Sequence, residues 1–80
     1  MINNELIKAL EIEKRGDWDT AHKIVQQFYT PEACWIHAYL HRKEGDLGNA
    51  DYWYSRASRK RPDKSLEMEW KDLYDHMKNL

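Results

Sequence analysis

The sequence has little of what supports a disulfide framework, a strong surface charge or a membrane span. Its one cysteine, Cys34, cannot form a disulfide within the chain. The 13 Lys and Arg residues nearly balance the 14 Asp and Glu residues, and the net charge of −1 gives no general attraction for polyanions. No apolar run approaches the ~20 residues of a bilayer-spanning helix, and Asn3, Glu5 and Lys8 interrupt the region where a signal peptide would be apolar. We therefore expect a cytoplasmic protein that does not enter membranes.

Glycine and proline are also scarce, with three and two residues, so few positions break a helix. Hydrophobic residues make up 41% of the chain and charged residues 34%, a balance typical of a folded helical protein rather than a disordered one. A chain of 80 residues is long enough for one domain with a modest core. We expect a single all-α domain over residues 1–80.

A short pattern occurs twice in the chain at an offset of 29 residues. The matched residues are Gly16, Asp17 and Ala21 in the first copy and Gly45, Asp46 and Ala50 in the second. Each glycine is predicted to end a helix in the left-handed conformation, and each aspartate to cap the next helix by accepting from its free N–H groups. The small alanine then lets the two helices approach closely. A period of this size predicts stacked helical hairpins.

Hydrophobic periodicity and these turns together predict five helices. Two antiparallel hairpins, at about residues 2–29 and 31–60, are expected to stack on each other. An amphipathic helix at about residues 63–79 is expected to cover the end of the stack. Its apolar stripe consists of Leu66, Trp70, Leu73 and Met77. Its acidic residues, including Glu69, are expected to face solvent.

The segment from Trp35 to Asp63 resembles a tetratricopeptide (TPR) repeat. The residues that carry the resemblance are Trp35, Ala38, Gly45, Asp46, Ala50, Ala57 and Pro62. Residues 2–31 look like a more degenerate copy, and the last helix stands in the place of the family's solvating helix. The offset of 29 residues is shorter than the family's usual 34, which indicates shorter connections. The resemblance implies a concave face, built from the first helix of each hairpin, that binds a peptide or helix of another protein.

On this concave face the resemblance places a cluster of aromatic, apolar and basic side chains. They are Leu10, Lys14, Trp35, Tyr39, Arg42 and Lys43, and we expect them to bind the partner. The expected function is a small non-enzymatic module for protein–protein interaction, without a cofactor. A stack of two hairpins also needs its ends covered, by the last helix, by the partner or by a second copy of the chain in a homodimer.

One basic run, residues 56–61, offers an alternative function in binding nucleic acid. Trp53 lies one helical turn before Arg56 and could serve as a stacking platform for a base. The same cations also complement the dipole at a helix C-terminus, which is the more ordinary reason for their presence. Nucleic acid is therefore the less favoured partner.

A third alternative is a metal-binding protein, because His37, His41 and Glu44 lie on one stripe of a predicted helix. A closed site needs a further ligand, which His22 or Asp51 could supply only if the fold brought it close. No HExxH pattern is present, and two histidines on a helix are more often explained by one that packs and one that is solvated. We therefore expect no metal site.

Catalytic residues are not recognisable in the sequence. Cys34 and His37 lie one turn apart, but on the most apolar of the predicted helices and without a group to orient the histidine. Phosphate-binding and dinucleotide-binding loops are absent from the sequence. We expect no enzymatic activity.

Overall fold

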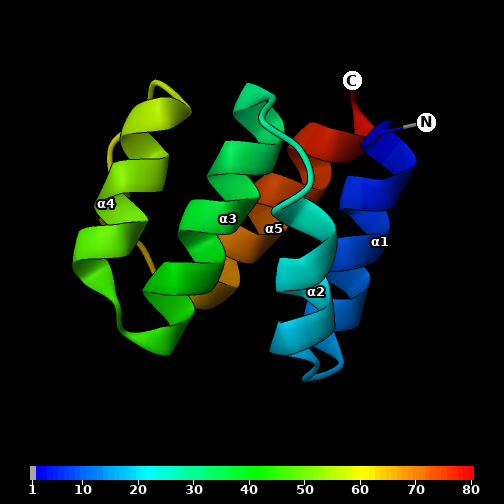
Figure 1. The fold of residues 1–80 in the computed structure, drawn as a ribbon, viewed down its shortest axis with the longest axis horizontal. Helices are drawn as coiled ribbons and strands as arrows, with labels where there is room; N and C mark the ends of the chain where they lie inside the picture. The colour runs from blue at the N-terminus through cyan, green and yellow to red at the C-terminus, as the bar shows by residue number, and fades with distance from the viewer. Residues whose placement is uncertain (1) are drawn as a thin grey trace.

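The computed structural model describes residues 2–80, and this part of the chain forms five α-helices without a strand (Figure 1). The helices are α1 (Ile2–Lys14), α2 (Trp18–Val25), α3 (Pro31–Glu44), α4 (Leu47–Arg56) and α5 (Leu66–Lys78). The predicted all-α fold class is confirmed. None of these five helices combines the length and the apolar composition that crossing a membrane requires.

The two Gly-Asp turns have the same geometry. Gly16 and Gly45 end α1 and α3 in the left-handed region, with φ angles of 101° and 91°. Asp17 and Asp46 then cap the following helices, each accepting a hydrogen bond from the backbone N–H three residues later, at 3.1 and 3.2 Å. The sequence interpretation of both turns is confirmed.

The first four helices pack in chain order as two neighbouring hairpins. α1 contacts α2, α3 contacts α4, and the contact between α2 and α3 joins the hairpins. Ala21 of α2 and Ala50 of α4 are fully buried, as the predicted close approach of the helices requires. α3 lies in the middle of the molecule (Figure 1), and every residue from Ala33 to His41 is buried.

Two helices are shorter than the hydrophobic pattern predicts. α2 ends three residues before Phe28, which packs on the core from the connection to α3. α4 ends because Ser58 adopts a left-handed conformation with φ 58°, which lets the Arg59 N–H donate to the Tyr54 carbonyl at 2.9 Å. Apolar spacing alone does not reveal these ends, because the side chains beyond them still face the core.

The last helix starts at Leu66 rather than near residue 63. The Ser65 hydroxyl accepts a hydrogen bond from the Met68 N–H at 3.1 Å and so caps the helix. Residues 57–65, called the 57–65 segment below, therefore form an irregular connection between α4 and α5.

α5 lies across the first helices of both hairpins. It packs on α1 and α3, and Trp70 Nε1 donates to the Leu10 carbonyl at 3.0 Å. Leu73 and Met77 of its apolar stripe are buried. α5 thus covers the concave face that the TPR resemblance predicts to be open to a partner. The expected open groove over α1 and α3 is not formed. The apolar stripe predicts that α5 packs, but its spacing does not say on which helices.

Glu69 departs most clearly from the amphipathic pattern of α5. The prediction that it faces solvent is wrong, because only 1% of it is exposed. Its carboxylate accepts hydrogen bonds from Trp35 Nε1 at 3.1 Å, from Arg42 Nη1 at 2.8 Å and from the Tyr54 hydroxyl at 2.6 Å. A carboxylate with three donors, one of them charged, can be buried at acceptable cost. These bonds tie α5 to α3 and α4.

Candidate functional site

The six predicted partner-binding residues do not share one open surface. Leu10, Trp35 and Tyr39 are buried, with 0%, 7% and 2% of their surface exposed. Arg42 lies beneath α5 and pairs with Glu69. The physical reason is the position of α5, which occupies the face on which these side chains gather.

A small cavity remains at the edge of α5 that faces α1. Its volume is about 210 Å³, and Lys14, Tyr39 and Lys43 line it together with Trp70. Both lysines already have partners, because Lys14 Nζ lies 4.1 Å from the centre of a Trp70 ring and Lys43 pairs with the buried Glu13. These cations are therefore committed to holding α1, α3 and α5 together.

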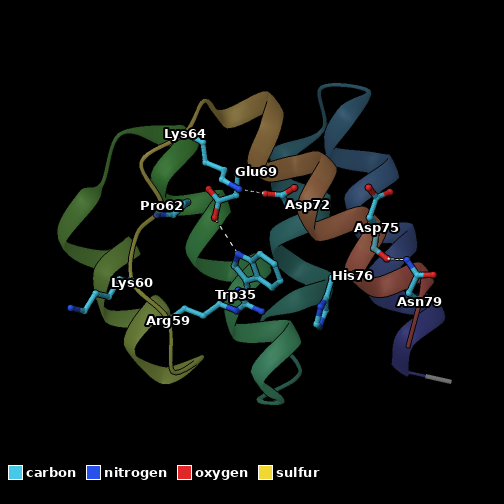
Figure 2. Close-up of a pocket in the computed structure, with 10 residues that line it drawn as sticks. All are labelled: Trp35, Arg59, Lys60, Pro62, Lys64, Glu69, Asp72, Asp75, His76 and Asn79. Atoms are coloured by element: carbon cyan, nitrogen blue, oxygen red, sulfur yellow. Dashed lines mark hydrogen bonds and ion pairs between the residues drawn. The ribbon is translucent and has the colours of Figure 1, made fainter.

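A larger groove lies on the other side of α5, between that helix and the 57–65 segment (Figure 2). Its volume is about 380 Å³. The residues that line it are Trp35, Arg59, Lys60, Pro62, Lys64, Glu69, Asp72, Asp75, His76 and Asn79. Trp35 from α3 forms the base, so one predicted site residue does lie in a groove.

The Trp35 ring is held firmly at this base. Its Nε1 donates to the buried Glu69 carboxylate, which also accepts from the Tyr54 hydroxyl. Burial raises the pKa of Tyr54, and the hydrogen bond to Glu69 and the charge of Glu69 raise it further, so the hydroxyl stays a donor. The hydrogen bond at its polar end thus favours the orientation in which the ring faces the groove.

The walls of the groove carry opposite charges. On the 57–65 segment, the Arg59 guanidinium lies 3.5 Å from the centre of the Trp35 ring. Lys60 lines the same wall, but its side chain points away from the ring (Figure 2). On α5, Asp72 and Asp75 line the facing wall (Figure 2). Within residues 2–80, Arg59 and Lys60 form no ion pair, whereas Lys64 pairs with Asp72 at 2.5 Å. A ligand therefore meets two cations that lack a carboxylate partner in the described part of the chain, and one of them, Arg59, lies on the aromatic ring.

The rest of the basic run is engaged nearby. Arg61 pairs with Asp51 at 3.4 Å. The Arg56 guanidinium lies 5.8 Å from the Tyr52 ring centre and 5.7 Å from that of Trp53. The basic run thus has two parts. Arg56 and Arg61 contact side chains of α4, whereas Arg59 and Lys60 line the groove.

A second cluster lies where α2 packs on α3. His22 Nε2 lies 3.1 Å from His37 Nε2, and His41 Nδ1 lies 3.0 Å from Glu44 Oε2. Of the two further ligands considered from the sequence, the fold brings His22 to the pair of histidines, whereas Asp51 is engaged with Arg61.

The protein environment favours the uncharged form of His37 and of His22. Burial lowers the pKa of His37 to about 4, and the neighbouring His22 and His41 contribute to the shift. Burial also lowers the pKa of His22, with a further contribution from His41. Neutral imidazole is the form that binds metal ions.

Cys34 has the surroundings of a structural thiol. It is 1% exposed, and its Sγ lies 3.8 Å from the Tyr29 carbonyl, which it can donate to. Its position on the buried α3 explains why it packs like a small apolar side chain.

The groove contains residues that the sequence interpretation did not connect. Asp72 and Asp75 are three residues apart on α5, so helical spacing alone places them on neighbouring positions of one face. What the spacing does not show is that this face meets the 57–65 segment over Trp35. The chain matches no protein family model, no curated protein sequence and no solved structure in comparisons with known proteins.

Proposed function

We propose that this chain is a small non-enzymatic protein-interaction module that binds an extended peptide of a partner protein. The binding site is the groove between α5 and the 57–65 segment, with Trp35 at its base. The peptide carries an acidic side chain next to a large apolar one. We further propose that the two hairpins form a short TPR-like stack, which the equal geometry of the Gly16 and Gly45 turns supports.

The observation that carries the proposal is the Trp35 ring with Arg59 lying on it. An exposed arginine held by a cation–π contact gains only about 0.5–1 kcal/mol from it, so a ligand can displace it readily. Once Arg59 moves aside, an apolar side chain of the peptide can pack on the same face of the indole. The released guanidinium can then pair with a carboxylate of the same peptide.

The charges of the two walls indicate an extended ligand with side chains of both signs. Successive side chains of an extended peptide point in opposite directions. An acidic residue can therefore face Arg59 and Lys60 while a basic neighbour faces Asp75, beside the pair of Asp72 with Lys64. This complementarity selects for a peptide with alternating charge rather than for a uniformly acidic one.

The same arrangement weighs against nucleic acid as the ligand. A phosphodiester backbone that approached Arg59 and Lys60 would also come near Asp72 and Asp75 on the opposite wall. Arg61 is already paired with Asp51. Few cations remain to neutralise phosphates, and the salt dependence that accompanies nucleic-acid binding requires several of them.

The test is to select ligands from a library of random linear peptides displayed on phage, with the full chain immobilised, and to measure their affinities by calorimetry. Selected peptides are expected to share an acidic residue with an aromatic or aliphatic residue on one side and a basic residue on the other. The variant Arg59→Ala with Lys60→Ala should bind them at least about 10-fold more weakly, because it loses the charge pairing in the groove.

The matched control is Lys8→Ala with Lys23→Ala, which removes the same charge from two exposed lysines of α1 and α2. It should bind the selected peptides as the unaltered chain does. Equal binding by the groove variant and the control variant would contradict the proposed site. Preferential binding of single-stranded DNA, steeply weakened by salt, would favour the nucleic-acid alternative instead.

A further inference from the structure

Three of the four histidines lie together between the hairpins, outside the proposed groove. One ring nitrogen each from His22, His37 and His41 lies within 4.8 Å of the other two. The ring centres are 4.7 Å apart for His22 and His37, 5.3 Å for His22 and His41, and 5.0 Å for His37 and His41. α3 places two of them on one face, and the packing of α2 adds the third.

Protein groups alone satisfy this cluster poorly. The contact between His22 Nε2 and His37 Nε2 uses one nitrogen of each ring. His37 is 5% exposed, and within residues 2–80 its buried Nδ1 has no hydrogen-bond partner. Buried polar atoms are nearly always paired, so the unpaired Nδ1 shows that the ring is not placed here for its hydrogen bonds to protein groups. Apolar side chains would stabilise a contact between two helices better than this cluster does.

Two tryptophans hold the rings in place. Trp18 stacks on His22 with ring centres 4.9 Å apart and an angle of 9° between the planes. Trp53 stacks on His37 at 4.0 Å and 11°. The Trp18 indole is itself fixed, because its Nε1 donates to the Leu40 carbonyl at 2.7 Å. The rings are thus oriented before any ligand arrives, which reduces the entropy cost of binding one.

The geometry and the chemistry of the donors fit a tetrahedral transition-metal ion. Imidazole nitrogens favour Zn²⁺, Cu²⁺, Ni²⁺ and Co²⁺ over Mg²⁺ and Ca²⁺. Two ligand nitrogens on one tetrahedral ion lie ~3.3 Å apart, because Zn–N bonds are ~2.0–2.1 Å long. This distance is close to the 3.1 Å between His22 Nε2 and His37 Nε2. His41 Nδ1 meets Glu44, the carboxylate contact that typically fixes a ligand histidine and leaves its Nε2 for the metal.

We propose that His22, His37 and His41 bind one Zn²⁺ ion, which clamps α2 to α3. The fourth coordination position belongs to a water molecule on the side of the half-buried His22. Since α2 and α3 belong to different hairpins, the ion links the two halves of the chain. A domain of this size has a small core, and a bound metal ion adds stability that the core does not supply.

The experiment is calorimetric titration of ZnCl2 into the chelator-treated full chain, combined with thermal unfolding followed by circular dichroism. The unaltered chain should bind one Zn²⁺ ion and unfold at a temperature several degrees higher in its presence. His22→Ala should weaken the affinity at least ~10-fold and remove the gain in stability. His22 is only half-buried, so its truncation leaves the core intact.

The matched control is His76→Ala, which removes the histidine outside the cluster and should bind Zn²⁺ as the unaltered chain does. The proposal is overturned if the unaltered chain shows no saturable binding, or if His22→Ala binds as tightly as His76→Ala. If His22→Ala loses its helical spectrum, the visible absorption of Co²⁺ bound to the unaltered chain decides. Intense tetrahedral bands support the site, and their absence refutes it.

Discussion

Arg42 Nη1 of α3 lies 2.8 Å from Glu69 Oε1 of α5, and this ion pair fastens the last helix over the face that would otherwise be an open groove. Glu69 is 1% exposed, and the Arg42 side chain is 16% exposed. Arg42 also donates to the Lys64 carbonyl, which anchors the 57–65 segment to α3. One guanidinium thus holds both walls of the proposed binding groove.

Replacing Arg42 by alanine should destabilise the fold strongly, because it leaves the Glu69 carboxylate buried without its counter-charge. We expect a loss of about 3–5 kcal/mol in the free energy of unfolding, measured by urea denaturation. The comparison is Lys64→Ala, which removes an exposed ion pair with Asp72 and should cost no more than about 1 kcal/mol. Similar losses in the two variants would show that the buried pair does not hold α5.

Acid should destabilise the fold through His37. Its pKa is about 4 in the folded chain against an ordinary value of 6.5, so between these values the unfolded chain binds more protons. The free energy of unfolding should therefore fall as the pH drops from 6.5 towards 4, by on the order of 1–3 kcal/mol. His22 of α2 and His41 of α3 face this ring, and the lowered pKa of His22 acts in the same direction.

Urea denaturation of metal-free protein at neutral pH and near pH 4 measures this effect. His37→Gln removes the titrating group, and the variant should lose less stability over the same interval than the unaltered chain. Carboxylates titrate in both proteins, so the difference between the two slopes is the informative quantity. Identical slopes would mean that His37 is not held neutral by its surroundings.

The left-handed helix ends should respond in opposite ways to substitution. Gly45→Ala should lower the free energy of unfolding by about 1 kcal/mol, because a φ of 91° is strained for alanine. The added Cβ itself meets no atom within 4 Å. Ser58→Gly should gain about 0.5–1 kcal/mol, because a residue with a side chain now holds φ at 58°. Thermal unfolding of both variants tests this, and a stabilised Gly45→Ala would show that the turn has been misread.

Ala50 should not tolerate a larger side chain. It is fully buried on α4, and leucine there should overpack the second hairpin at a cost of about 1–3 kcal/mol. The adjacent Asn49 is exposed on the same helix, and Asn49→Leu should leave the melting temperature nearly unchanged. Equal stability of the two leucine variants would contradict the close packing of α3 and α4.

The local features of the fold could be predicted because neighbouring residues determine them. The Gly16-Asp17 and Gly45-Asp46 turns carry their own conformational preference and capping group, and both form as expected. The position of α5 could not be predicted this way. Its apolar stripe fits any apolar surface, and the choice of α1 and α3 depends on the donors that meet Glu69.

The candidate sites also depend on contacts between distant parts of the chain. Trp35 is prominent in the sequence, but its place at the base of a groove depends on where α5 and the 57–65 segment run. The spacing of His37 and His41 is visible in the sequence, whereas the approach of His22 follows from the packing of α2 on α3. Residue spacing alone therefore predicts neither the groove over Trp35 nor the cluster of three histidines.

The most direct test of the account is nuclear magnetic resonance mapping of a selected peptide on the isotopically labelled chain. Binding in the proposed groove should shift the Trp35 indole N–H resonance and the backbone amides of Arg59, Lys60, Asp75 and His76. The backbone amide resonances on the side of α5 that packs on α1 should stay unchanged. Shifts confined instead to Lys14 and Lys43, with loss of the α5 contacts, would show that the ligand displaces α5 and binds the face beneath it, and would contradict the proposed groove.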